Sequence, residues 1–189
     1  MADAFAVADF RAAQHLTLLE RAIGDAPEGR IASGPTADAR HDVRSISGTT
    51  ALLALRARTP LVRSVLEVDE VAFPSEWALD STSLRDALRA TPRSRVFHVT
   101  TGGEMVGFLL VGIGNGTSYI QRLAVRPHCQ KQGVARALME RGVEWARRLG
   151  ATNSVVNTEF DNTPALALYT SMGFAPMDHG LTVMERTLP

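Results

Sequence analysis

The 189-residue chain has one cysteine, no net charge and no long apolar run. Cys129 alone cannot form an intramolecular disulfide or a cysteine-based zinc cluster, which favours a reducing cytoplasm. Twenty basic residues balance twenty acidic ones, so no overall positive field draws the chain to nucleic acid. No stretch approaches the roughly 20 apolar residues of a membrane span, and acidic residues in "MADAFAVADF" disfavour a signal peptide. We therefore expect a cytoplasmic protein without nucleic-acid or membrane binding.

The N-terminal quarter differs in pattern from the rest of the chain. Residues 5–23 carry apolar side chains at three-and-four spacing, which predicts an amphipathic helix ended by Gly24. Residues 24–50 are rich in Gly, Pro, Ser and Asp without a period, which is typical of a linker. We divide the chain into a helix and loose arm at 1–48 and one domain at 49–189, long enough to bury a core.

The domain shows alternating strand and helix patterns without an internal repeat. The expected order is β-α-α-β-β-β-α-β-α-β-β, which predicts an α/β (α+β) fold. The expected elements are a strand at 51–58, helices at 60–73 and 81–90, strands at 95–100, 104–113 and 118–125, a helix at 133–149, a strand at 154–160, a helix at 162–172 and strands at 173–177 and 181–188.

The stretch "LAVRPHCQKQGVARALMERG" (123–142) is typical of an anion-binding strand-to-helix connection. A helix N-terminus offers unpaired backbone N–H groups and partial positive charge. Gly133 and Ala135 keep the approach open, and no acidic residue occurs from Leu123 to Met139. Further donors come from Gln130, Lys131, Gln132 and Arg136. The alternative is a plain connection; the P-loop and dinucleotide fingerprints are both missing.

Two spaced motifs resemble those of the GNAT N-acetyltransferase superfamily. The first resembles the family's cofactor motif, with Leu123, Val125, Pro127, Gln130, Gly133 and Ala135 in the motif positions. The second, "NTEFDNTPALALYTSMGF", resembles its later motif, with Asn162, Ala165, Leu168, Tyr169, Gly173 and Phe174 in place. The resemblance covers about residues 50–189. "EVDEVAFPSEW" adds a likeness to the bacterial ribosomal-protein alanine N-acetyltransferase type.

The resemblance implies a GNAT fold, a mixed and mostly antiparallel sheet flanked by helices with one splayed parallel strand pair. It implies acetyl-CoA as cosubstrate and acetyl transfer to a primary amine, with a protein N-terminal α-amine as the expected acceptor. A small-molecule amine and a non-catalytic acyl-CoA sensor are the alternatives. We expect a monomer or homodimer without a metal. The implied cofactor-binding residues are Leu123, Ala124, Val125, Gln130, Lys131, Gln132, Gly133, Val134, Ala135, Arg136 and Asn162.

The resemblance also assigns the reacting groups, with one departure. The resemblance implies that Tyr169 is the acid beside the thioester sulfur. The alternative is that Tyr169 only packs its ring against the sheet. Asn157 stands where the alanine N-acetyltransferase relatives carry a glutamate base, and an amide cannot serve as a base. Glu159, two residues on, points to the same strand face and is the candidate base. A surface glutamate, with deprotonation by solvent, is the alternative.

Residues outside the two motifs have weaker interpretations. The segments "FPSEWALD" and "PMDHG" are expected to contact the acceptor, through Glu76, Asp80, Asp178 and His179. Each of these is also a plausible solvated loop group. Cys129 has no histidine at an informative spacing and His98 is interpreted as structural, so neither is assigned to catalysis.

Overall fold

The computed structural model describes residues 10–23 and 41–185, which fall into two compact units. The large unit is Ala22–Ser154, and the small unit combines Met1–Arg21 with Val155–Pro189. The elements are β1 (Arg11–Ala22), β2 (Val43–Ser47), α2 (Gly48–Arg56), α3 (Pro60–Ala72), α4 (Ser81–Arg89), β3 (Arg93–Thr101), β4 (Glu104–Gly114), β5 (Thr117–Val125), the 3-10 turn η2 (Pro127–Cys129), α5 (Val134–Arg148), β6 (Asn153–Glu159), α6 (Thr163–Ser171), β7 (Ala175–Pro176) and β8 (Leu181–Glu185).

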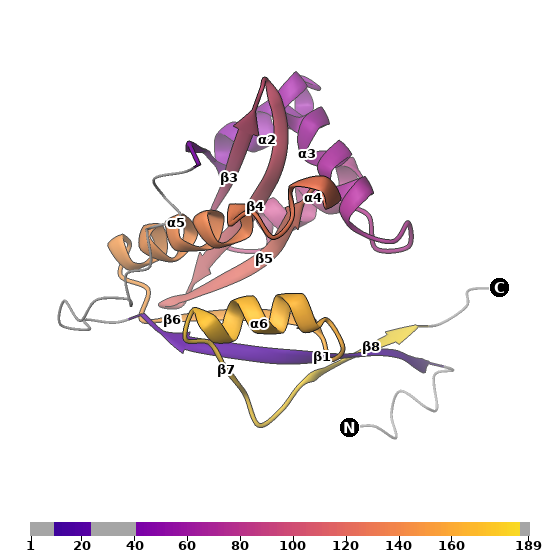
Figure 1. The fold of residues 1–189 in the computed structure, drawn as a ribbon, viewed down its shortest axis with the longest axis vertical. Coiled ribbons are helices and arrows are strands. Elements are labelled where there is room, and N and C mark those ends of the chain that lie inside the picture. The colour runs from indigo at the N-terminus through magenta and orange to yellow at the C-terminus, as the bar shows by residue number, and fades with distance from the viewer. Residues whose placement is uncertain (1–9, 24–40, 186–189) are drawn as a thin grey trace. The chain divides into compact units, whose positions relative to one another are not determined.

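The large unit is an antiparallel meander, β2-β3-β4-β5, covered by helices (Figure 1). Strand β4 is buried on both faces, since Phe108 and Leu109 are each fully buried. Phe108 packs in the core formed with α2, α3 and α4. On the opposite face, a Cβ on Gly142 of α5 would lie 2.5 Å from Leu109 Cδ2. Helix α5 therefore packs directly against β4. A strand buried on both faces needs apolar residues at nearly every position, as the sequence of β4 has.

The small unit is built around β1, which lies between β6 on one edge and β7 and β8 on the other (Figure 1). Residues Arg11–Leu16 pair with β8, and Leu19 and Glu20 pair with β7, all antiparallel. Helix α6 runs along this group of strands. Leu19, Tyr169 and Phe174 are buried in the unit. The chain's first described strand is thus central to the unit that also holds its last described residues.

The helix predicted at residues 5–23 is wrong, because β1 occupies Arg11–Ala22. Ala, Leu, Glu and Arg favour helix intrinsically, but pairing on both strand edges overrides that preference. Leu18 is half-buried and Leu19 fully buried, so adjacent apolar residues pack on opposite faces and mimic helical spacing. Residues 5–9 of the predicted helix lie outside the described residues.

The strand predicted at residues 51–58 is also wrong, because α2 spans Gly48–Arg56. Ser47 Oγ accepts a hydrogen bond from Thr50 N at 3.2 Å and caps this helix. Ala51 and Leu55, one turn apart, are buried against the meander. The strand lies instead at Val43–Ser47, within the predicted linker, of which residues 24–40 fall outside the described part.

The other predicted elements are confirmed to within a few residues, except that residues 186–188 of the last predicted strand lie outside the described residues. The final two strands occur as β7 and β8, although both pair with β1. Helices alternating with mostly antiparallel strands confirm the predicted α/β (α+β) class. In the part of the chain that is described, no helix has the length and apolar character needed to cross a membrane.

Candidate active site

The connection from β5 to α5 makes a sharp turn at the helix N-terminus. Gly133 is the N-cap residue with φ of 89°, and Lys131 has φ of 59°. The φ of Lys131 lies in the small left-handed region that L residues can reach, whereas the φ of Gly133 lies beyond it, so a side chain at position 133 would be strained. Val134, Ala135 and Arg136 form the first turn, whose N–H groups have no acceptor one turn back in the helix. The backbone here is that of an uncapped helix N-terminus, and anion binding at it stays a prediction.

Side chains of the loop brace its shape. Gln130 Nε2 donates to Val125 O at 3.3 Å, and Gln132 Nε2 donates to His128 O at 3.0 Å. The side-chain amides of Gln130 and Gln132, which the sequence predicts as donors to an anion, are thus bonded within the loop and stabilise it. His41 Nε2 lies 3.0 Å from Gln132 O. No pattern in the sequence indicates this contact, because His41 lies 91 positions away from Gln132.

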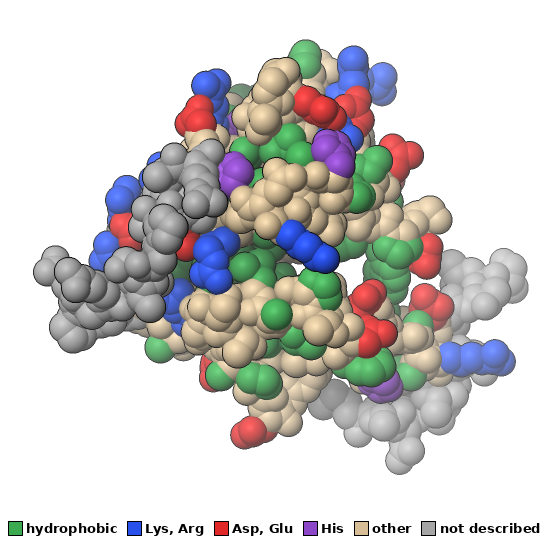
Figure 2. Space-filling view, viewed as in Figure 1, with side chains coloured by type: hydrophobic (Ala, Val, Ile, Leu, Met, Phe, Trp, Pro, Cys, Tyr) green, Lys and Arg blue, Asp and Glu red, His purple; other side chains and the backbone are tan. Residues whose placement is uncertain are grey.

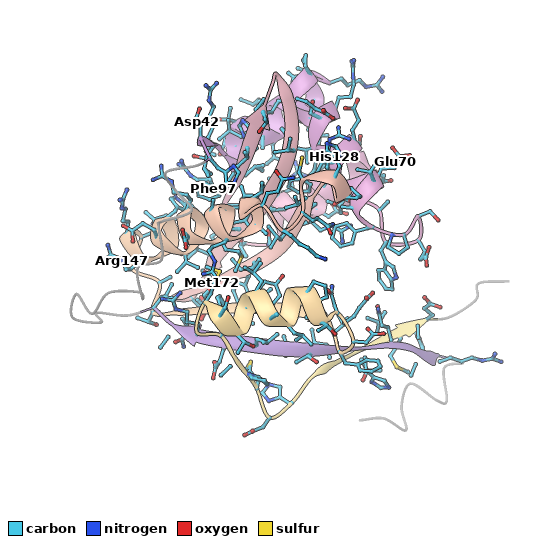
Figure 3. The ribbon with its side chains drawn as sticks, in the orientation of Figure 1. Asp42, Glu70, Phe97, His128, Arg147 and Met172 are labelled. Carbon is cyan, nitrogen blue, oxygen red and sulfur yellow. The ribbon has the colours of Figure 1, made fainter. Side chains whose placement is uncertain are left out.

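The end of β5 is fixed by β4 and by α5. Leu123, Ala124 and Val125 pair with Leu109, Phe108 and Gly107. A Cβ on Gly107 would lie 3.0 Å from both Ala124 O and Val134 Cγ1. The glycine therefore lets the start of α5 rest directly on the strand. Figure 3 labels His128, which lies on the stretch between β5 and α5.

The small unit carries Asn162 and Tyr169 on α6. Asn162 Oδ1 accepts a hydrogen bond from Ala165 N at 3.2 Å, so Asn162 is the N-cap residue of α6. Tyr169 is 5% exposed, and its ring centroid lies 6.0 Å from that of Phe174. Burial raises the pKa of the Tyr169 phenol to about 12. The hydroxyl is therefore protonated at neutral pH and has a proton with which to donate a hydrogen bond.

Strand β6 presents Asn157 and Glu159 on its less buried face. Val156 and Thr158 are buried on the opposite face, Asn157 is exposed and Glu159 is half-buried. Glu159 Oε1 accepts a hydrogen bond from Gln14 Nε2 of β1 at 2.6 Å. The sequence gives no sign of this role for Gln14, which falls within the segment predicted as a helix. The structure thus adds an orienting donor to the candidate base.

A buried ion pair holds the segment between α3 and α4 against β5. Fully buried Asp69 accepts from Arg122 Nε at 2.7 Å and Nη2 at 2.8 Å, and from Leu79 N at 2.7 Å. Arg122 Nη2 also donates to Trp77 O at 2.7 Å, and its Cζ lies 3.5 Å from the Phe73 ring centroid. Bidentate geometry and the ring contact both strengthen such a pair. In the sequence, the only sign of this ion pair is that an aspartate, Asp69, occupies a core-facing position of a helix.

The four acceptor-contact candidates have different surroundings. Asp80 Oδ1 accepts from Thr82 N and from the backbone and hydroxyl of Ser83, so its carboxylate caps α4. Hydrogen bonds from Ser83 are the main cause that lowers the pKa of Asp80. Glu76 is exposed in the large unit, and Asp178 and His179 are exposed in the small unit. Asp80 therefore caps its helix, the other three side chains are exposed, and contact of any of the four with an acceptor stays a prediction.

Figure 2 shows basic and acidic side chains interspersed on the face in view. Among residues 10–23 and 41–185, no group of three or more His, Cys, Asp or Glu could hold a metal ion.

Comparison with known proteins places this geometry in a family. The model of the Acetyltransferase (GNAT) family matches residues 62–174, and the chain belongs to this family. It is 31% identical over 78 residues to the [Ribosomal protein bS18]-alanine N-acetyltransferase of Escherichia coli, covering 41% of this chain and 53% of the relative. It is 30% identical over 127 residues to the mycothiol acetyltransferase of Pseudarthrobacter chlorophenolicus, covering 60% and 39% respectively. The chain thus spans about half the length, or less, of these curated relatives.

Solved structures confirm the predicted GNAT fold. The crystal structure of the ribosomal-protein-S18-alanine N-acetyltransferase from Escherichia coli gives a TM-score of 0.57 at 22% identity, covering 71% of this chain and 77% of that one. A GCN5-related N-acetyltransferase from Sphaerobacter thermophilus gives a TM-score of 0.65 at 17% identity, covering 97% and 54%.

Proposed function

We propose that this chain transfers the acetyl group of acetyl-CoA to a primary amine, with a protein N-terminal α-amine as the acceptor. The observation that carries the proposal is the left-handed Gly133 at the start of α5, in a chain of the GNAT family. The Escherichia coli relative is named for N-acetylation of an alanine of a ribosomal protein, and this supports a protein N-terminal α-amine as the acceptor.

The loop suits the diphosphate of coenzyme A. The first-turn N–H groups supply donors, Gly133 presents no side chain, and no carboxylate occurs from Leu123 to Met139. The pantetheine amides are proposed to pair with the backbone at the end of β5. The residues proposed for the cofactor remain Leu123, Ala124, Val125, Gln130, Lys131, Gln132, Gly133, Val134, Ala135, Arg136 and Asn162.

The proposed reaction requires two proton movements. Glu159 takes one proton from the acceptor ammonium, and the freed lone pair forms a C–N bond with the thioester carbonyl carbon. The C–S bond then breaks, and the nitrogen's second proton passes to the departing sulfur. A phenol with a pKa of about 12 transfers its proton reluctantly to a thiolate of pKa about 8.5, so Tyr169 stabilises the leaving sulfur chiefly by hydrogen bonding.

Two alternatives each have an observation in their favour. The exposed amide of Asn157 cannot accept the proton, which favours a non-catalytic acyl-CoA sensor. The mycothiol and streptothricin acetyltransferases among the relatives favour a small-molecule acceptor.

A product screen with acetyl-CoA tests all three functions. We would incubate the chain with acetyl-CoA and a panel of N-terminal peptides and small amines, and identify acetylated products by mass spectrometry. Transfer to peptide α-amines is expected, and Tyr169→Phe should reduce it. Transfer only to small amines contradicts the acceptor assignment. Calorimetric binding of acetyl-CoA without any acetylated product favours the sensor.

A further inference from the structure

We propose that Gln14 of β1 positions the Glu159 carboxylate to accept the acceptor's proton, so that the N-terminal strand belongs to the active site. This inference rests on the proposed acetyl transfer. Gln14 lies outside residues 62–174, the part of the chain that the family model matches.

The contact is short, and strand pairing with β8 holds its Gln14 end. Gln14 Nε2 lies 2.6 Å from Glu159 Oε1, across 145 positions of the chain, and both side chains are half-buried. Gln14 pairs with Val183 of β8 on the opposite edge of β1, and Leu16 pairs with Leu181. This ladder fixes the register of β1, and a shift by one residue would turn the Gln14 side chain to the other face.

The chemistry of a neutral amide suits a positioning role. The Gln14 N–H group engages Oε1 and leaves Oε2 of the same carboxylate to accept a proton. An amide does not compete for that proton, and it adds no cation that would form an ion pair with the base. A free glutamate side chain samples many rotamers, so an orienting bond increases the fraction of carboxylates in a productive geometry.

The next residue on β1 provides a matched control. His15 Nδ1 lies 3.2 Å from Thr182 Oγ1 of β8, which is also a side-chain contact from β1 to another strand. Neither His15 nor Thr182 has an assigned role in the proposed reaction. His15→Ala therefore removes a comparable cross-strand contact without touching Glu159.

A double-mutant cycle on acetyl transfer tests the inference. We would measure kcat and KM for wild type, Gln14→Ala, Glu159→Gln, the double variant and His15→Ala, with circular dichroism to verify folding. Gln14→Ala is expected to lower kcat about 10-fold and leave KM for acetyl-CoA unchanged within about twofold. In the Glu159→Gln background the same change should have less than about a twofold effect, since Gln14 acts through Glu159. His15→Ala should match wild type.

The outcomes separate this inference from the proposed function. An equal effect of Gln14→Ala in both backgrounds, or no effect in wild type, overturns the positioning role while acetyl transfer stands. A Glu159→Gln variant with wild-type kcat removes Glu159 as the base and overturns the positioning role with it. A wild-type chain that acetylates no amine contradicts the proposed function itself.

Discussion

The β5–α5 loop and the Gln14–Glu159 pair differ in how far apart along the chain their residues lie. The loop turns on Gly133 and is braced mainly by contacts over four or five positions. The Gln14–Glu159 pair spans 145 positions and depends on β1 lying beside β6. Local backbone chemistry is readable from a short stretch of sequence, whereas a contact between distant strands requires the strand order to be known.

The large unit also has a long-range polar contact, the Arg122–Asp69 pair, and it differs in burial from Gln14–Glu159. The side chain of Asp69 is fully buried and that of Arg122 is 17% exposed. The small-unit pair is half-buried and only one partner is charged. We therefore expect the first contact to control stability and the second to control turnover, and the following experiments test that difference.

The largest expected effect is on the buried ion pair. Asp69→Ala should lower the free energy of unfolding by about 3–5 kcal/mol, because it leaves the Arg122 guanidinium without its counter-charge. Urea unfolding followed by circular dichroism measures the loss. The double variant Asp69→Leu with Arg122→Met should be much more stable than Asp69→Ala, since both charges are removed. A loss below about 1 kcal/mol in Asp69→Ala would show that the pair contributes as little as a surface contact.

Tyr169→Phe should have the next largest effect, on turnover. Loss of the hydroxyl is expected to lower kcat about 100-fold with little change in acetyl-CoA affinity, because the leaving sulfur loses its hydrogen-bond donor. Steady-state kinetics and calorimetry measure the two quantities. The chain's other tyrosine, Tyr119, is 40% exposed in the large unit, and Tyr119→Phe is the matched control. Equal kcat values for the two variants would remove Tyr169 from the mechanism.

The same tyrosine should make the protein sensitive to alkaline pH. Burial raises the folded-state pKa of Tyr169 to about 12, whereas an unfolded tyrosine has a pKa of about 10. The folded state therefore holds the proton more tightly, and stability is lost as pH rises from about 10 through 12. Unfolding at pH 9, 10 and 11 should show this decline in wild type and a weaker one in Tyr169→Phe. If stability declines with pH equally in both proteins, the Tyr169 phenol is more solvated than it is in the structure.

Gly133→Ala should weaken acetyl-CoA binding about 10-fold. Alanine at φ of 89° is strained by about 1–2 kcal/mol, and relief of that strain moves the N–H groups that hold the anion. Gly150 at the other end of α5 has φ of 82°, with nothing within 4 Å of an added Cβ. Gly150→Ala should therefore show a similar loss of stability with unchanged affinity, as measured by calorimetry. If both variants bind like wild type, the loop does not hold the cofactor through its backbone.

The parts of the fold that could be predicted are those with local signals. The meander was predictable because Gly102 and Gly103 mark one turn and "GNGT" marks the next. Helix α5 was predictable from its apolar stripe and the glycines at its two ends. The cap on α6 followed from Asn162 immediately before Thr163 and Pro164.

The parts that could not be predicted depend on distant partners. The sequence of β1 has helical propensity, and its strand form exists because β6, β7 and β8, more than 130 positions away, pair with it. The contact of Gln14 with Glu159 was unpredictable for the same reason, because it depends on the strand form of β1. Arg122 is one of twenty basic residues, and only the packed structure brings it to Asp69. The site was thus predictable in its loop and motif positions, and unpredictable in the contacts that orient them.

The smallest expected effect is an acid-sensitive contribution from the large unit, in contrast to the alkaline sensitivity of Tyr169. His98 of β3 is 8% exposed, and its Nδ1 is buried without a hydrogen-bond partner among the described residues. Burial, and then the charge of Arg44 on the paired strand, lower the pKa of His98, while Asp42 opposes the shift.

The unfolded state therefore binds the proton first as pH falls below about 6.5, and folding loses stability from there downward until the folded histidine also titrates. Urea unfolding at pH 7.5, 6.5 and 5.5 should show a shallower decline for His98→Gln than for wild type. His15→Gln, at an exposed histidine of β1, should keep the wild-type slope. A steeper decline in His98→Gln would mean that the protonated imidazole is stabilised in the fold, and that Asp42 outweighs burial and Arg44 at this position.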